Sequence, residues 1–104
     1  MEQNQKPNVN PKDVFLLNTN TQLKQQQSEI DKLQKLVSTD QEIIDLRIKV
    51  KDAAKAQLEN GVITANDYLR EVNAEDQARQ SLITHQVQLI QAQINYQTIS
   101  GQSN

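Results

Sequence analysis

Hydrophobic side chains recur every three or four residues along most of the chain, which is the period of an α-helix. The pattern is uninterrupted from Leu23 to Glu59, and a second stretch with the same period runs from about residue 65 to about residue 99. Asn10 and Pro11 are suited to open the first helix, because proline is favoured at the first helical position. The sequence therefore predicts two long helices, at about 10–59 and 65–99.

The segment from residue 14 to residue 20 leaves two interpretations open. The run "NTNT" at residues 18–21 is a poor helix interior, since Asn and Thr side chains compete for backbone hydrogen bonds. The preceding "VFLL" could then be the end of a strand, with the firm helix beginning near Thr21. Alternatively the helix runs unbroken from Asn10 and is about 70 Å long at ~1.5 Å per residue. Residues 1–9 are predicted to be disordered, and residues 102–104 to form a tail after Gly101.

Signals for the end of one helix and the start of the next lie close together in "LENGVITANDYL", residues 58–69. Gly61 can take the left-handed conformation that ends a helix. Thr64 and Asp67 have the spacing of a capping box, in which each side chain binds the backbone N–H of the other. With so short a connection the helices must run antiparallel. The predicted fold class is all-α, a long antiparallel two-helix coiled-coil hairpin over residues 10–101 with its tip at residues 60–64.

The first helix carries two apolar lines rather than one. The first line repeats every seven residues, with two further aliphatic residues beside it: Leu23, Ile30, Val37 and Ile44, with Leu33 and Ile48. The second line lies about 120° away at ~100° per residue. It consists of Leu36, Ile43, Val50 and Ala54. The polar strip predicted between the two lines contains Asp40, Arg47 and Lys51.

The second helix repeats this arrangement. Its first line consists of Ala74, Ala78, Leu82, Leu89, Ala92 and Tyr96. Its second line consists of Leu69, Val72, Ile83, Val87, Ile90 and Ile94. The polar residues predicted between them are Glu75, Arg79, Gln86, Gln93 and Gln97. A hairpin can cover one line per helix, so the second lines require further helices. A closed ring of helices, a self-assembled bundle and an ordinary bundle with a wide apolar face all satisfy the pattern.

The composition excludes several classes of protein. At 104 residues the chain is at most one small domain. With 3% aromatic residues it has few large side chains from which to build a compact core. A net charge of −2 offers no basic surface for nucleic acid. The first residues lack the apolar segment of a secretory signal, and no apolar run is long enough to span a bilayer. By itself the chain is therefore expected to be soluble, with no membrane span.

Candidate chemistry is sparse. The sequence has no cysteine, and its one histidine, His85, is predicted to pack beside Leu82 and Leu89. A metal site or a catalytic group needs converging partners, which the sequence does not supply. The serines have no base within helical reach. We therefore expect no catalytic residue, no cofactor and no metal site, and a protein that is not an enzyme.

Residues 58–101 resemble the last helical hairpin of the TolC family of outer-membrane efflux proteins. The features that carry the resemblance are a glycine at the tip, a β-branched pair, an Asp-x-Leu, an alanine-containing helix, an aromatic residue and a closing glycine. In this sequence they are Gly61, Val62 to Thr64, Asp67 and Leu69, Ala78, Tyr96 and Gly101. Upstream, "SEIDKLQKLVSTDQEIIDLRIKVKDAAKAQ" is similar to the long descending helix of the same hairpin, so the resemblance covers about residues 14–101.

The resemblance implies a function in transport. Proteins of this family are trimers in which a β-barrel in the outer membrane continues as an α-helical barrel across the periplasm. The hairpin tip meets a periplasmic adaptor (membrane fusion) protein, which couples the channel to an inner-membrane pump in a tripartite efflux system. The implied adaptor-docking residues here are Gly61, Val62, Ile63 and Thr64, while Asp67 and Leu69 would form the cap and the first packing layer. Other copies of the chain would complete the trimer, which would export small molecules or proteins.

The sequence departs from the family's pattern in two respects. Some members have an arginine two positions after the tip glycine as part of a closing network, and Ile63 occupies that position here. The family's β-barrel strands and the first of its two repeats are missing from these 104 residues. We therefore expect either an excerpt of a channel whose parent resides in the outer membrane and periplasm, or a short relative. The alternative function is a stand-alone helical interaction module that self-associates through its second lines.

Overall fold

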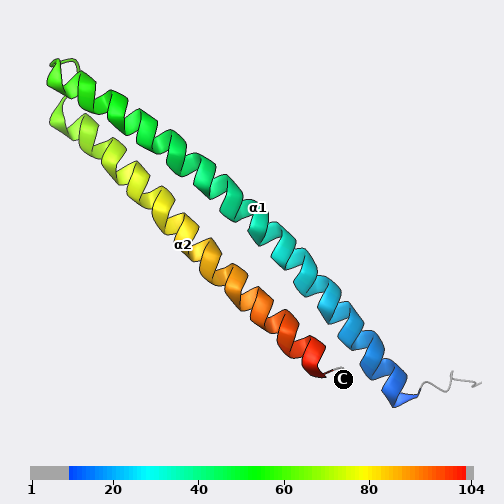
Figure 1. Cartoon of the computed structure of the whole chain (residues 1–104). Helices are drawn as coiled ribbons and strands as arrows, with labels where there is room; N and C mark the ends of the chain where they lie inside the picture. The colour runs from blue at the N-terminus through cyan, green and yellow to red at the C-terminus, as the bar shows by residue number, and fades with distance from the viewer. Residues whose placement is uncertain (1–9, 103–104) are drawn as a thin grey trace, which may run out of the picture.

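Two helices account for nearly all of the described part of the chain, residues 10–102, in the computed structural model (Figure 1). Helix α1 spans Pro11–Glu59 and helix α2 spans Ala65–Gln102. They lie side by side in opposite directions, joined by a short turn at one end of the molecule (Figure 1). The predicted all-α, two-helix hairpin is confirmed. Residues 1–9 and 103–104, which include the segment predicted to be disordered and most of the predicted tail, lie outside the described residues.

Helix α1 is continuous through the segment for which a strand was the alternative, so the strand interpretation is wrong. The Asn10 side chain caps the helix by accepting a hydrogen bond from the Lys12 N–H at 2.9 Å. Thr19 and Thr21 donate their hydroxyl protons to the carbonyls of Phe15 and Leu17, at 2.8 and 3.0 Å. Because these threonines bind the helix's own backbone, they are accommodated in its interior rather than ending it.

Helix α2 ends later than the sequence predicts. Its last residue is Gln102 instead of about 99, and Gly101 lies inside the helix. A single glycine costs a helix only about 1 kcal/mol relative to alanine. That is too little to end a helix of 38 residues.

The main apolar cluster between the helices lies toward the open end of the molecule. Its buried members are Ile30, Leu33 and Ala92, with Leu36, Leu89 and Tyr96 packed against them. Ile44 and Ala54 are also buried, closer to the tip. Leu33 is the most deeply buried large side chain, with 2% of its surface exposed. Helix α1 has 49 residues and α2 has 38, so the first turns of α1 extend past the end of α2 (Figure 1). This extension carries four exposed apolar side chains: Val14, Phe15, Leu16 and Leu17.

Within the described residues, neither helix contains a segment long and apolar enough to cross a membrane. The apolar residues of both helices are distributed along faces instead of being continuous. Their distribution therefore determines which surfaces are left for partners.

Candidate functional site: the hairpin tip and the exposed helix faces

The turn at the tip is a Schellman motif, which satisfies the last carbonyls of α1. Val62 donates its N–H to the Gln57 carbonyl at 2.8 Å, and Gly61 donates to the Leu58 carbonyl at 3.0 Å. Gly61 has a φ of +71°, the left-handed conformation predicted for it. The geometry explains the glycine, because this φ strains residues that have a Cβ.

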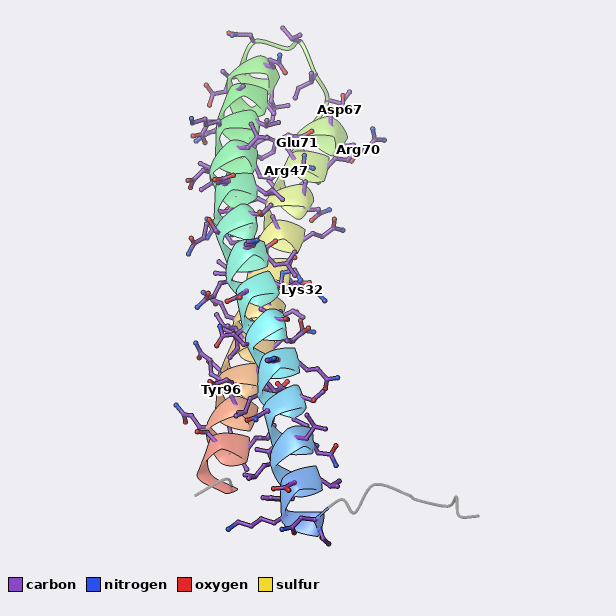
Figure 2. All side chains as sticks on the ribbon, turned by 90° about the vertical axis from the view of Figure 1, so that its right-hand side faces the viewer. Lys32, Arg47, Asp67, Arg70, Glu71 and Tyr96 are labelled. Carbon is purple, nitrogen blue, oxygen red and sulfur yellow. The ribbon has the colours of Figure 1, made fainter. Side chains whose placement is uncertain are left out.

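The start of α2 is a capping box, as predicted. Asp67 donates its N–H to Thr64 Oγ1 at 3.2 Å, and Thr64 donates its N–H to Asp67 Oδ2 at 3.1 Å. The hydrogen bonds from the Thr64 backbone and side chain lower the pKa of Asp67, with a smaller contribution from Arg70, which lies 3.5 Å away. Figure 2 shows Asp67, Arg70 and Glu71 together on the first turns of α2. Thr64 and Asp67 therefore fix the direction in which α2 leaves the tip.

The remaining predicted tip residues differ in exposure. Val62 is 69% exposed at the end of the molecule, and Ile63 is half-buried. A side chain added at Gly61 would contact no atom within 4 Å, so the surface beside Val62 is open. Leu69, which also belongs to the second line of α2, is 52% exposed, so the hairpin itself does not cover it. Leu69 precedes Ile83 and Ile90 by multiples of seven residues, which places it on the outer face of α2.

The first lines of the two helices form the contact between them. On α1, Ile30, Leu33 and Ile44 are buried, and Leu23, Val37 and Ile48 are half-buried. On α2, Ala92 is buried, and the other members are half-buried: Ala74, Ala78, Leu82, Leu89 and Tyr96. The hairpin thus uses one line per helix.

The second lines remain largely uncovered. On α2 they leave Leu69, Ile83, Val87, Ile90 and Ile94 exposed, while Val72 is half-buried. On α1 they leave Ile43 and Val50 exposed, with Leu46 beside them. Two assignments are corrected: Ala54 is buried, and Leu36 packs against the core. Both lie at the edge of the first line, close enough to α2 to be covered by it.

A polar group interrupts the apolar contact near the middle of the hairpin. Asp40 is 6% exposed, accepts a hydrogen bond from Ser81 Oγ at 3.3 Å, and places its Oδ2 2.5 Å from Nδ1 of His85. The sequence prediction placed Asp40 in a polar strip between the lines, which is wrong. Asp40 follows Leu33 by seven residues and therefore faces α2. The seven-residue spacing from Leu33 is the sequence signal that could have predicted the burial of Asp40.

His85 lies at the predicted place, half-buried in the contact between the helices, but its partner was missed. Ser81 donates to Asp40 and not to the imidazole of His85, so these three side chains lack the serine–histidine hydrogen bond that activates a serine nucleophile. The arrangement of Asp40, Ser81 and His85 supports a role in pairing α1 with α2.

A second polar group lies closer to the tip. Glu75 is 7% exposed, and its two carboxylate oxygens lie 2.7 Å from Lys51 Nζ and 2.8 Å from Arg79 Nε. It was predicted to be in a polar strip, but it precedes Leu82 by seven residues and faces α1. One turn earlier, Oε2 of Glu71 is buried without a hydrogen-bond partner among the described residues. The half of the hairpin next to the tip therefore includes an ion pair between the two helices beside its apolar contacts.

This ion pair predicts a pH dependence of stability. Hydrogen bonds from Lys51 and then Arg79 lower the pKa of Glu75 below its ordinary value of 4.5, and Glu75 raises the pKa of Lys51 above 10.5. A carboxylate with a lowered pKa contributes stability above its unfolded pKa and loses it as the pH falls through the folded pKa. We expect the melting temperature to fall as the pH drops below 4.5, and to fall less in Glu75→Gln. Glu29→Gln, which affects only an exposed pair with Lys32, is the control; an equal effect in both variants contradicts the assignment.

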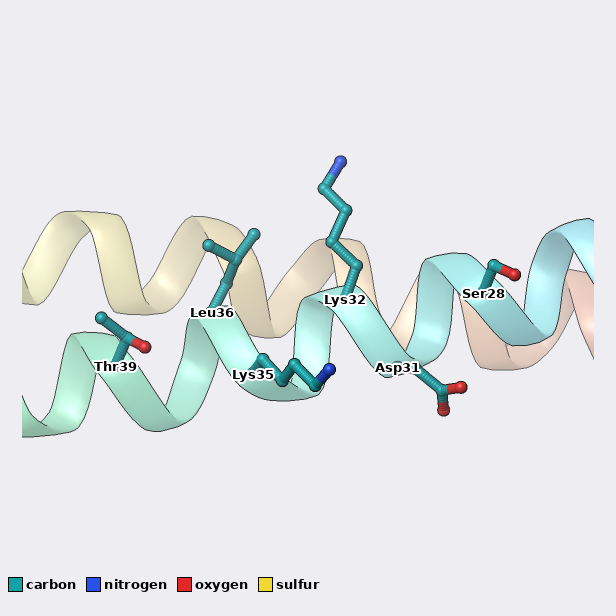
Figure 3. Close-up of a pocket in the computed structure, with 6 residues that line it drawn as sticks. All are labelled: Ser28, Asp31, Lys32, Lys35, Leu36 and Thr39. Carbon is teal, nitrogen blue, oxygen red and sulfur yellow. The ribbon is translucent and has the colours of Figure 1, made fainter.

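The surface depressions of the described residues do not suggest a ligand-binding site. Figure 3 shows one of them, a shallow depression on α1 alone. It is lined by Ser28, Asp31, Lys32, Lys35, Leu36 and Thr39. Lys32 extends away from the helix, and the lining side chains do not enclose a common point (Figure 3).

Among residues 10–102 no three His, Cys, Asp or Glu side chains are grouped so that they could hold a metal ion. The candidate site is therefore a set of surfaces: the apolar tip around Val62 and the exposed second lines of α1 and α2. In comparisons with known proteins, no family model, no curated protein and no solved structure matches this chain.

Proposed function

We propose that this chain forms a wall element of a helical efflux tunnel, as the periplasmic hairpins of TolC-like channels do. The observation that carries the proposal is that apolar residues of the second lines stay exposed after the hairpin has formed, most of the line on α2 and Ile43 and Val50 on α1. In a closed ring every helix packs against a neighbour on each side, and such a ring would cover both lines. The resemblance of residues 58–101 to the family's last hairpin supports the same assignment.

In this proposal the tip docks a periplasmic adaptor. The Schellman turn and the capping box hold Val62 in a fixed position at the end of a rigid hairpin. A turn that only joined two helices would need Gly61, Thr64 and Asp67 but not a valine with 69% of its surface in solvent. Val62 is therefore the apolar side chain that an adaptor at the tip would contact.

Val62→Asp separates docking from folding. We expect the melting temperature of this chain to be unchanged, because Val62 is exposed, while export by the complete channel is lost. Export is measured as accumulation of a fluorescent pump substrate in cells. Retained export in Val62→Asp, with normal amounts of the protein, contradicts a docking role for the tip.

The tip glycine supplies a matched pair of variants. Gly61→Val places a β-branched residue at a φ of +71° and should impair export by distorting the turn, with trimer assembly largely retained. Gly61→Asn should preserve export, since asparagine tolerates this conformation. Equal export in the two variants would show that export does not depend on the left-handed conformation of residue 61.

A second candidate function is self-association as a helical interaction module. The observation that favours it is the exposed line on α2, where Ile83, Val87, Ile90 and Ile94 are each about half exposed. Such a surface is large for a monomeric helix and calls for a partner. A concentration-dependent oligomer of the 104-residue chain is the expected result, and a chain that stays monomeric at all concentrations contradicts this candidate.

A further inference from the structure

The second half of α2 presents an apolar stripe that has no charged residue between its two ends. Ile83, Val87, Ile90 and Ile94 are 59%, 49%, 55% and 53% exposed, and we call them the α2 stripe. Their spacing of four, three and four residues aligns them on one face of the helix. From Gln80 to Gln102 the sequence contains no Asp, Glu, Lys or Arg, and the residues flanking the stripe are Thr and Gln.

The hairpin itself cannot cover the α2 stripe. Leu89 and Ala92 are among the residues that face α1. At ~100° per residue the stripe lies roughly on the opposite side of α2 from them. Its occupant must therefore come from outside the hairpin.

We propose that a second copy of this chain covers the α2 stripe, in an antiparallel contact about a twofold axis. The spacing of the stripe is the same in both directions along the helix. Reversing one copy therefore places Ile83 opposite Ile94 and Val87 opposite Ile90. The inference rests on the second candidate function, self-association of the chain on its own, and names its partner and orientation; in a closed ring a neighbouring helix would take this place.

Charge favours this orientation over a parallel one. Asp76 precedes Ile83 by seven residues and is exposed on the same face of α2. A parallel contact in register would place Asp76 of one copy against Asp76 of the other, and facing like charges are unfavourable. In the antiparallel contact Asp76 lies opposite Gly101, which is uncharged.

Charge also favours an α2–α2 contact over a contact between α2 and α1 of the second copy. The exposed apolar residues of α1 have Glu42 and Lys49 beside them, both exposed. Covering them with the uncharged α2 surface would remove water from these charges without supplying a partner. In the antiparallel contact residues 80–97 of the two α2 helices face each other, and none of them is Asp, Glu, Lys or Arg.

The contact between two α2 stripes is smaller than a stable protein interface. The stripe is about 17 Å long at ~1.5 Å per residue. A specific, stable interface usually covers about 800 Å² on each partner, which is more than a single helix face of this length provides. The dimer is therefore reversible and forms as the concentration rises.

Disulfide trapping tests both the partner and the orientation, because the chain contains no cysteine of its own. Equal amounts of Ile83→Cys and Ile94→Cys chains, carrying different tags, are mixed and oxidised. We expect several-fold more linked dimer in this mixture than with Ile83→Cys alone. In the antiparallel contact the two copies of residue 83 lie about 16 Å apart along the axis, too far for a disulfide.

Three results overturn the proposal. Linked dimer from Ile83→Cys alone indicates a parallel contact. Preferential linkage of Ile83→Cys to Leu46→Cys indicates a contact between α2 and α1 of another copy. Equal, low linkage in all mixtures indicates that the stripe is not a contact between copies. None of these results bears on the tip, whose role is tested by export in Val62→Asp.

Sedimentation of the unmodified chain provides an independent measurement. We expect the mass to rise with concentration from 11.8 kDa toward twice that value. Ile90→Asp should remain at 11.8 kDa, while Leu46→Asp, equally accessible at 59% exposure but on α1, should still dimerise. An unmodified chain that remains at 11.8 kDa contradicts the proposal.

Discussion

Leu33→Ala is expected to destabilise the hairpin by about 2–5 kcal/mol, the range for removing a buried leucine side chain. Leu33 is 2% exposed and lies at the centre of the small cluster with Ile30 and Ala92. A two-helix hairpin has few other buried contacts to compensate for the loss. Helix propensity contributes little to the change, since leucine and alanine are both good helix formers. The effect therefore measures packing between α1 and α2.

Urea unfolding followed by circular dichroism measures this change. Leu46→Ala is the matched control, because Leu46 is on the same helix but 59% exposed, and its effect should be within about 0.5 kcal/mol of zero. If the two variants lose similar stability, the two helices do not pack through the first lines as described.

His85→Ala is expected to destabilise the hairpin by about 1–3 kcal/mol, because it leaves a buried acceptor without its partner. Asp40 would keep its hydrogen bond from Ser81 but lose the one at Oδ2. Replacing both Asp40 and His85 with leucine removes the unpaired acceptor as well. We expect the double variant to be at least as stable as the wild type, since apolar replacements of buried polar pairs are often neutral or stabilising.

The same chemical unfolding experiment compares the two variants. A double variant that is no more stable than His85→Ala would show that His85 contributes through something other than Asp40. Ser81→Ala, which removes the longer hydrogen bond of 3.3 Å, is expected to have a smaller effect than His85→Ala. A larger effect of Ser81→Ala contradicts the description of this group.

The pattern of apolar residues was sufficient to predict the helices, the antiparallel turn and the separation into covered and uncovered lines. Helical period, the left-handed glycine and the capping box are local properties, and each is encoded within a few residues of sequence. The exposure of Ile83, Ile90 and Ile94 followed from the same reasoning, because two helices cannot cover four lines.

The burial of Asp40 and Glu75 and the partner of His85 were not predicted, because polar residues were assumed to face solvent. Asp40 and Glu75 occupy positions of the seven-residue repeat that face the other helix, and they are buried because each meets its partners there. The partner of His85 lies 45 residues away in sequence and is brought close only by the register of the hairpin. The continuation of α2 through Gly101 was missed for another reason, because one glycine costs too little to end a long helix.

If this hairpin is a wall element of an outer-membrane efflux channel, as we propose, it is part of a much larger outer-membrane protein. An antibody raised against this chain can detect that protein in fractionated cells of the source organism. We expect a band several times heavier than 11.8 kDa in the outer-membrane fraction. A band near 11.8 kDa, absent from that fraction, would contradict the channel and leave self-association as the function of the exposed faces.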